Sequence, residues 1–358
     1  MPAARTPWWT WAWPVAAWLI LAVTAKSEMS GLIATGAVAS LVGSVFAAVH
    51  HAEVVAHRIG EPLGTLVLAA AVTVIEVALI VFIMIGVGGK AGLARDTVFA
   101  AVMIVCNGIV GLCLLVGGMR HHEQGFQVQG ASAALAVLAA LTILTLVVPN
   151  VTTSAPGPVF STPQLVFASV ISLMLYGSFI FVQTVRHRDY FLPVGGGREQ
   201  AHADPPSGRT ALVSSALLIA SLVAIVGLAE ILTSIVEIAI VRVGAPKAVV
   251  GIVIAALVLL PEGTAAVRAA RANRLQTSLN LALGSALASI GLTIPTVAVV
   301  AIALGQPLEL GLGEKDEVWL VLTLLVGVIT LGTGRTTVLQ GIVHLIIFAA
   351  FLFLAVVP

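Results

Sequence analysis

Long apolar stretches alternate with short polar ones along almost the whole chain. About 20 consecutive apolar residues are enough to cross a bilayer as a helix. Eleven stretches of that kind predict membrane helices at residues 8–25, 31–49, 63–88, 97–117, 131–148, 163–185, 210–230, 247–267, 277–303, 317–333 and 337–357. The seventh can extend to Arg242, which would tilt or break it. The pattern predicts an all-α polytopic membrane protein with about eleven transmembrane helices.

The longest polar stretch divides the predicted helices into two groups. Residues 186–209 are rich in glycine, proline and charge, which is typical of a flexible linker. Six helices precede the linker and five follow it, so setting the first aside leaves five plus five. Two related units of five helices must cross the membrane in opposite senses, and such inverted repeats are a transporter architecture. We expect an extra N-terminal helix in 1–28, repeats over 29–190 and 210–358, and a cytoplasmic linker at 191–209.

Lysine and arginine gather on one side of the predicted helices. Eleven of the 17 fall on the side of the amino terminus and six on the other. Because cytoplasmic loops carry an excess of these residues, we expect a cytoplasmic amino terminus and an external carboxy terminus. The first helix is expected to be retained, since the Trp-rich stretch after Arg5 leads into an apolar run without a convincing cleavage site.

Composition supports the membrane assignment and excludes several functions. The chain is 59% hydrophobic and 9% charged, whereas an average soluble domain is roughly 25% charged. A net charge of +1 without a basic run gives no indication of nucleic-acid binding. No phosphate-binding loop is present, so we expect no enzyme and no cofactor. The expected partners are the lipid bilayer and inorganic cations, and the sequence leaves the oligomeric state open.

Two glutamates lie inside otherwise apolar helices. A carboxylate within a membrane span is costly and usually functional. Glu76 lies near the centre of its helix, while Glu262 stands between Pro261, which removes a backbone donor, and Gly263, which loosens the helix. Carbonyl groups near Glu262 can therefore turn toward an ion. Each glutamate lies in the second helix of its five-helix unit. The alternative is a pair of carboxyl groups that only tie helices together.

If these two glutamates lie close together, protons and cations would compete for binding to them. Burial disfavours the charged form of a carboxyl group, and a second carboxylate nearby disfavours it further. Both groups then tend to hold protons until a cation favours the charged forms. Hard cations such as calcium prefer carboxylate and carbonyl oxygens. One site can hold protons or a cation, and alternating access would turn that competition into exchange.

Four segments carry a resemblance to a known family. They are HHAEVVAHRIGEPLGTLVLAAAVTVIEV at 50–77, APKAVVGIVIAALVLLPEG at 245–263, NLALGSALASIGLTIP at 280–295 and GRTTVLQGIVHL at 334–345. The chain resembles the cation/proton exchanger branch of the calcium/cation antiporter superfamily, including bacterial calcium–proton antiporters that also exchange sodium or potassium. The resemblance implies two repeats that meet head to head around the ion in the bacterial inner membrane, with Glu76 and Glu262 as the acidic residues.

Small polar residues near the glutamates are further candidate ligands. The wider family often has asparagine three residues before each acidic residue, where this chain has Thr73 and Leu259. The family's Gly-Ser pair in the helix after Glu262 is present here as Gly284-Ser285. Its counterpart in the first half is Asn107-Gly108, and Ala288 stands where many relatives have a glutamine. We expect the transported cation to be bound by Glu76, Glu262, Thr73, Asn107 and Ser285. The alternative for the three small residues is helix–helix hydrogen bonding. The reduced number of side-chain oxygens leaves sodium or potassium open as the cargo.

Five further residues are candidates for proton or cation access. His50, Glu53 and His57 share a helix face. Imidazole suits zinc, but a structural zinc site has four ligands and the sequence shows no fourth. We favour an access role, with a solvated interfacial helix as the alternative. Glu230 and Glu237, seven residues apart, either line an external cation entrance or lie at the interface without a specific role.

Two other groups of basic residues have simpler interpretations. Arg268, Arg271 and Arg274 form a stripe at a spacing of three, which predicts a cytoplasmic anchor that fixes topology. Arg335 and His344 match the resembling family near the last helix, and the sequence assigns them no mechanism.

The favoured function is secondary antiport. Cytoplasmic calcium would leave in exchange for external protons at a paired-glutamate site, and sodium or potassium stay open as further cargo. One alternative is a sodium/potassium-selective proton antiporter without calcium transport, and another is a cation channel with a carboxylate filter. A carrier for an organic solute is disfavoured, because few aromatic or polar side chains lie inside the spans.

Overall fold

The computed structural model describes residues 7–24, 30–60, 63–86, 92–193, 206–244, 246 and 248–357. These residues form eleven continuous helical stretches, which confirms the predicted all-α fold. Eight of the described helices are long and apolar enough to cross a membrane by length and composition. The chain divides into two compact units, one of residues 1–88 and 198–244 and the other of residues 89–197 and 245–358.

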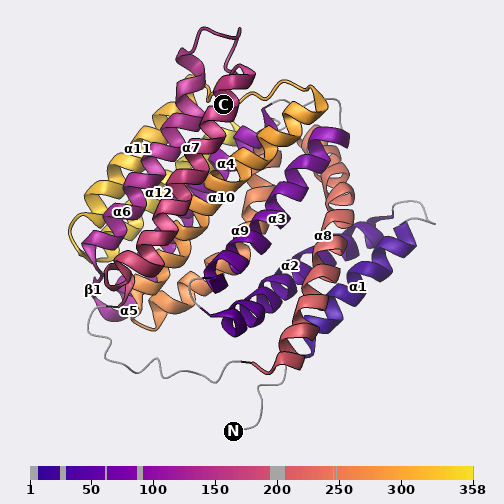
Figure 1. The fold of residues 1–358 in the computed structure, drawn as a ribbon, viewed down its shortest axis with the longest axis horizontal. Helices are drawn as coiled ribbons and strands as arrows, with labels where there is room; N and C mark the ends of the chain where they lie inside the picture. The colour runs from indigo at the N-terminus through magenta and orange to yellow at the C-terminus, as the bar shows by residue number, and fades with distance from the viewer. Residues whose placement is uncertain are drawn as a thin grey trace. The chain divides into compact units, whose positions relative to one another are not determined.

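The described residues of the first unit form four helices. They are α1 (Trp9–Thr24), α2 (Gly31–Ile59), α3 (Leu63–Gly86) and α8 (Gly208–Val243). Helix α2 packs against the other three, and α1 and α8 run beside it (Figure 1). The seventh predicted helix does extend past Arg242, because α8 is one continuous helix of 36 residues.

Small residues and backbone carbonyls join α1 to its neighbours. A Cβ atom at Gly43 would overlap the Trp13 ring, so α1 and α2 approach closely at this point. Farther along α2, His51 Nε2 lies 3.1 Å from the carbonyl oxygen of Thr10. The indole nitrogen of Trp18 donates to the carbonyl oxygen of Ala220 in α8 at 3.2 Å. The extra N-terminal helix is therefore attached to both long helices of its unit.

The second unit contains the remaining helices. Its first stretch consists of α4 (Leu93–Met103), a π-helical turn η1 (Ile104–Ile109) and α5 (Val110–His121) without interruption. The others are α6 (Val128–Thr142) with η2 (Ile143–Val147) and η3 (Val148–Val151), α7 (Thr162–Phe181) with η4 (Val182–Arg186) and η5 (Arg188–Phe191), α9 (Ala248–Arg271), α10 (Leu275–Leu304), α11 (Glu314–Leu331) and α12 (Val338–Val356). Two short strands, β1 (Gln124–Gly125) and β2 (Arg335–Thr336), pair antiparallel.

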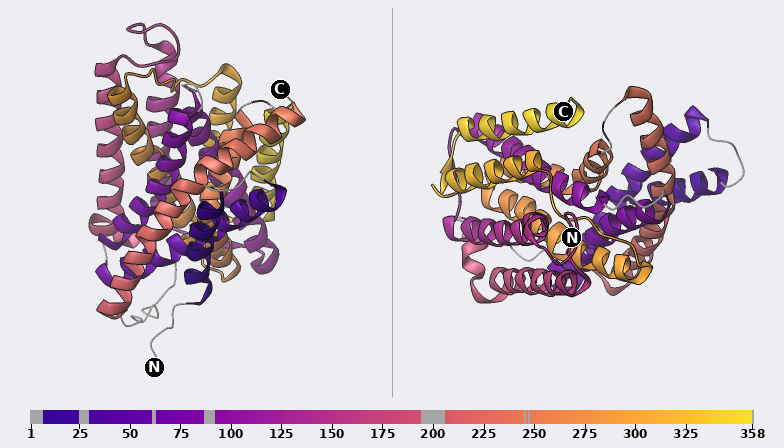
Figure 2. Two further views of the ribbon diagram at one scale, coloured as in Figure 1. Left: turned by 90° about the vertical axis from the view of Figure 1, so that its right-hand side faces the viewer. Right: turned by 90° about the horizontal axis from the view of Figure 1, so that it is seen from above.

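Helix α9 lies between two partners within this unit. It packs against α4 and α10, while α10 also packs against α6 and α7 (Figure 2). Gly251 allows the approach to α4, since a Cβ atom there would lie 3.0 Å from the backbone nitrogen of Thr97. At the other end of α9, Gln124 Nε2 donates to the carbonyl oxygen of Ala270 and to Asn273 Oδ1, both at 2.9 Å. Helix α9 is thus fixed at both ends.

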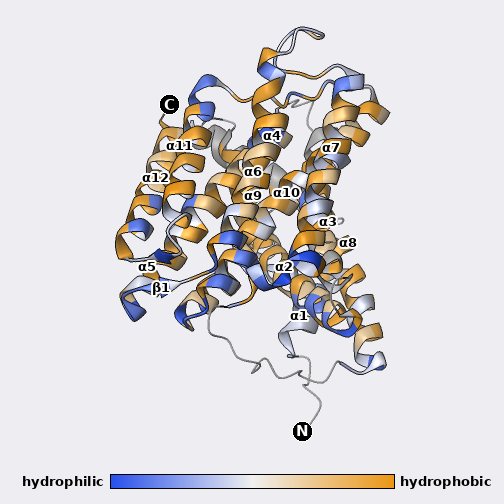
Figure 3. Ribbon diagram, turned by 60° about the vertical axis from the view of Figure 1, so that its left-hand side comes forward, coloured by the Kyte–Doolittle hydropathy of each residue, from blue (hydrophilic) through white to orange (hydrophobic). Residues whose placement is uncertain are grey.

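The outer surfaces of the helices are apolar. Hydrophobic residues cover most of each helix, and hydrophilic residues gather near helix ends and connections (Figure 3). Phe167 and Leu339, for example, are 67% and 66% exposed. Exposed apolar side chains of this kind are stable against lipid but not against water, which supports the membrane assignment.

Candidate functional site

Glu76 lies in α3 of the first unit and is buried. Its side chain is 2% exposed in α3, and both of its carboxylate oxygens are buried. Helix α3 packs against α2 and α8. The close approach to α2 depends on Gly64, where a Cβ atom would overlap the carbonyl oxygen of Ala56. The segment that leads into α3 therefore fixes the depth at which Glu76 lies.

Glu262 occupies a similar place in the second unit. It lies in α9, which continues through Pro261, and both of its carboxylate oxygens are buried. Helices α3 and α9 contain 24 residues each. Glu76 follows the first residue of α3 by 13 positions, and Glu262 follows that of α9 by 14. Both carboxyl groups are thus near the middle of helices of equal length. They belong to different units, and their meeting stays a prediction.

Two of the smaller candidates, Thr73 and Ser285, have buried hydroxyl groups. Thr73 is one turn before Glu76 and is 8% exposed. Ser285 lies in α10, which packs against α9. The hydroxyl oxygens of both residues are buried and make no hydrogen bond with the part of the chain that the structure describes. Both oxygens are therefore available as cation ligands.

Asn107, by contrast, makes hydrogen bonds with both its side-chain nitrogen and its side-chain oxygen. It is fully buried in η1, its Nδ2 donates to Thr323 Oγ1 at 2.8 Å, and its Oδ1 lies 3.1 Å from His344 Nδ1. A carbonyl oxygen only accepts, so Nδ1 of the histidine donates and Nε2 accepts from Thr330 Oγ1 at 3.1 Å. The hydroxyl of Thr323 donates in turn to the sulfur of Met103 at 3.3 Å. One directed chain of hydrogen bonds thus joins η1, α11 and α12.

The sequence did not indicate this chain of hydrogen bonds. His344 was noted without a role, and Thr323 and Thr330 were not singled out. The π-helical turn that carries Asn107 is a local widening of the helix, and such turns are frequent at functional sites. Within the described residues, the hydrogen bonds of Asn107 favour the helix-joining alternative for this residue.

Of the five candidate access residues, the structure describes the side chains of three, all in α2. Glu53 and His57 are exposed on α2, and the ring of His50 lies 5.6 Å from that of Trp9. The side chains of Glu230 and Glu237 lie outside the described part of the chain. Among the described residues, no three of His, Cys, Asp and Glu are grouped so that they could hold a metal ion.

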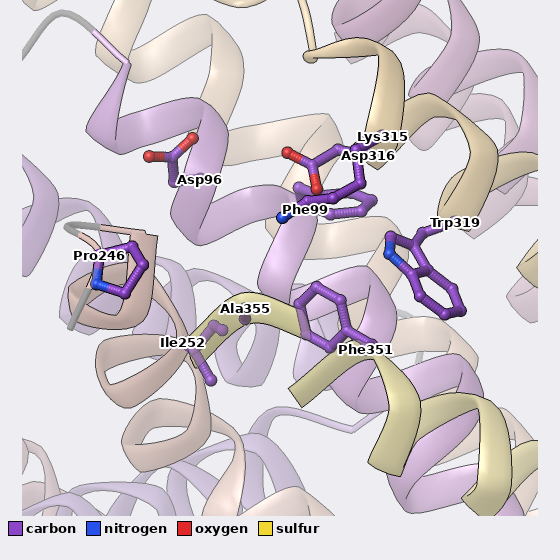
Figure 4. Close-up of a pocket in the computed structure, with 9 residues that line it drawn as sticks. All are labelled: Asp96, Phe99, Pro246, Ile252, Lys315, Asp316, Trp319, Phe351 and Ala355. Carbon is purple, nitrogen blue, oxygen red and sulfur yellow. The ribbon is translucent and has the colours of Figure 1, made fainter. Parts of the chain in front are cut away.

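A small cavity with charged walls lies where α4, α9 and α11 begin. Its volume is about 80 Å3, and Asp96, Asp316 and Lys315 line it together with apolar residues of α12 (Figure 4). Asp96 pairs with Arg95, whose Nε lies 2.8 Å from the carboxylate, and Arg95 also donates to the carbonyl oxygen of Gly311 at 3.0 Å. The sequence assigns no role to either Asp96 or Asp316.

Comparison with known proteins places this architecture in a family. The sequence profile of the sodium/calcium exchanger protein family matches residues 29–185 and 213–357. The chain belongs to this family. Among the described α-helices, the two matched segments include all except α1 and the first five residues of α8. This exchanger is therefore an integral membrane protein of the bacterial inner membrane, in the cation/proton exchanger branch that the resemblance predicted.

Two curated relatives cover nearly the whole exchanger. It is 51% identical over 364 aligned positions to the putative ionic transporter y4hA of Sinorhizobium fredii, covering 99% of this chain and 98% of the relative. It is 35% identical over 345 positions to the sodium-potassium/proton antiporter ChaA of Escherichia coli, covering 95% and 93%. Both relatives are transporters, which agrees with the expectation that the exchanger is not an enzyme.

A solved structure has the same fold. Native YfkE, a Ca2+/H+ antiporter protein, superposes with a TM-score of 0.76 at 17% sequence identity, covering 98% of this chain and 100% of YfkE. The likeness extends over the whole chain and supports the polytopic fold.

Proposed function

We propose that this exchanger expels cytoplasmic calcium in exchange for protons, with Glu76 and Glu262 as the two carboxyl groups that alternate between proton and cation. The observation that carries the proposal is the burial of all four carboxylate oxygens at matched depths of α3 and α9. A membrane protein keeps a carboxylate so deep only where it has a use, because burying its charge is costly.

The exchange cycle follows from the chemistry of these groups. Without a cation, burial favours the protonated form of each carboxyl group. A calcium ion favours the charged forms, so its binding releases protons and proton binding releases the cation. Thr73 and Ser285 supply further oxygens, and Pro261 leaves the carbonyl of the preceding turn without a helical donor. Such oxygens are the ligands that calcium prefers.

Sodium and potassium form the second candidate cargo. Leu259 and Ala288 stand where calcium-selective relatives carry side-chain oxygens, and both residues are buried apolar groups. A relative that is 35% identical is a sodium-potassium/proton antiporter. Loss of ligand oxygens weakens a divalent site more than a monovalent one, because calcium takes six to eight oxygens.

Purified exchanger in vesicles with a pH-sensitive dye inside tests the proposal. We expect calcium, sodium or potassium to drive proton movement, and comparison with and without a membrane potential separates electroneutral from electrogenic exchange. Glu76→Gln and Glu262→Gln should each abolish the signal. Glu123→Gln is the matched control, since Glu123 is exposed and pairs with Arg335 at 3.2 Å. Proton movement that survives both core substitutions would refute the mechanism, and saturable counterflow would exclude a channel.

A further inference from the structure

A large apolar groove runs along one side of α9 within the second unit. Its volume is about 730 Å3, and its walls come from α9, from η1 with α5, and from α12. Leu112 and Leu260 are 40% and 42% exposed along it. Among the described residues in its wall, only Thr264 carries a hydroxyl, and its Oγ1 already donates to the carbonyl oxygen of Pro261 at 2.8 Å. The groove thus offers an apolar body with no polar group for a small polar solute.

Two arginines lie at one end of this groove. Arg268 and Arg271 line it from the last turn of α9, and both are exposed. Among the described residues that line the groove, none is acidic. Guanidinium groups bind phosphate in a bidentate manner and stay charged at every physiological pH. This end of the groove therefore favours an anionic phosphate.

We propose that this groove binds an anionic phospholipid, with its phosphate on Arg268 and Arg271 and one acyl chain along α9 and α12. The dimensions agree. Leu260 and Arg271 are separated by 11 residues of one helix, or roughly 16 Å at 1.5 Å per residue. Half of the hydrocarbon core of a bilayer is about 15 Å thick. An acyl chain whose phosphate contacts Arg271 would reach the level of Leu260.

The side of the membrane also fits. The arginines lie on the side that the distribution of positive charge predicts to be cytoplasmic, and basic pockets between transmembrane helices on that side bind lipid head groups. The acyl chain would lie against Gly263, the neighbour of Glu262. The bound lipid would thus pack against the half of α9 that carries the candidate carboxylate. The inference does not depend on which cation is exchanged.

Native mass spectrometry of the purified protein, mixed with phosphatidylglycerol or phosphatidylcholine, tests the site. We expect phosphatidylglycerol to be retained in preference to phosphatidylcholine. The double substitution Arg268→Gln and Arg271→Gln should lower that retention about thirtyfold, because each basic residue near the surface contributes roughly 1 kcal/mol of attraction to anionic lipid. Arg274→Gln is the control for charge: it removes one positive charge three residues beyond the end of α9, and Arg274 does not line the groove.

A second variant tests the apolar part of the site. Val267 lies in the groove beside Arg268, so Val267→Trp should fill it and displace the acyl chain while both charges remain. Loss of phosphatidylglycerol in this variant supports the proposal. Equal losses for Arg274→Gln and the double substitution would show that the stripe acts only as a topology anchor and would overturn it. A lipid-free dimer that Val267→Trp dissociates would overturn it as well, since a second copy would then fill the groove.

Discussion

His344 in α12 holds the side chain of Asn107 in the π-helical turn through one hydrogen bond of 3.1 Å between Nδ1 and Oδ1. The two residues are 237 positions apart and almost fully buried. Because the imidazole also accepts from Thr330, it is a neutral bridge between α11 and the turn. A buried polar group that loses its only partner costs stability, so the bridge fixes the turn.

Replacement of the bridge should destabilise the protein. His344→Ala leaves Asn107 Oδ1 without a donor and opens a cavity, so we expect the free energy of unfolding to fall by about 2–4 kcal/mol. Equilibrium unfolding in detergent measures the loss. His344→Asn keeps an N–H near the position of Nδ1 and should recover part of the stability. If the alanine variant were as stable as the native protein, the hydrogen-bond chain would have no structural role.

Two helical glycines should respond to alanine with opposite signs. At Gly341, a Cβ atom would overlap the backbone nitrogen of Leu115 and lie 2.9 Å from the carbonyl oxygen of Gly111, so α12 could not approach α5. We expect Gly341→Ala to lower the free energy of unfolding by about 1–3 kcal/mol. At Gly177 nothing lies within 4 Å, and Gly177→Ala should raise it by about 0.5–1 kcal/mol. Thermal unfolding of both variants under one condition compares them directly.

The number of helices was predictable, but some of their ends were not. A bilayer requires about 20 apolar residues per helix, and that requirement alone yields eleven stretches. The second helix was expected to end at 49, whereas α2 continues to Ile59. Its last turns carry His50, Glu53 and His57 at helical spacing, and a count of apolar residues does not register a helix that continues into polar surroundings.

The candidate site was predictable only in part, for a similar reason. Glu76 and Glu262 are conspicuous because a carboxylate is rare in an apolar helix. The role of Asn107 depends on Thr323 and His344, which lie 216 and 237 positions away. Nothing local in the sequence distinguishes a ligand asparagine from one that joins helices. The groove beside α9 likewise arises from packing, and in the sequence its arginines predict no more than a membrane anchor.

Removal of the two small hydroxyl groups should affect cation affinity. Thr73→Val keeps the shape of the side chain, and Ser285→Ala removes one oxygen. Because neither hydroxyl bonds to another described residue, we expect stability to change little and KM for the cation to rise about tenfold, as one ligand lost costs about 1–2 kcal/mol. Dye-based proton transport at varied cation concentration gives KM.

Ser172→Ala provides the control for this pair. The hydroxyl of Ser172 is buried in α7 and donates to the carbonyl oxygen of Ala168 at 2.8 Å. Its loss should leave KM unchanged, because the bond lies within one helix. An equal KM in Thr73→Val, Ser285→Ala and native protein would assign both hydroxyl groups to helix packing.

Pro261 should lower the free energy of unfolding and, at the same time, strengthen cation binding. It lacks a backbone N–H, so the carbonyl of Leu257 has no helical donor although α9 continues through it. Pro261→Ala restores that bond, and we expect the free energy of unfolding to rise by about 1–2 kcal/mol. The same bond withdraws an oxygen from the neighbourhood of Glu262, so KM for the cation should rise several-fold.

Pro14→Ala is the control, because it changes a proline inside α1, far in sequence from either glutamate. It should alter stability without altering KM. If Pro261 only bends α9, Pro261→Ala would raise the free energy of unfolding and leave KM unchanged. That result would exclude the carbonyl oxygen of Leu257 as a cation ligand.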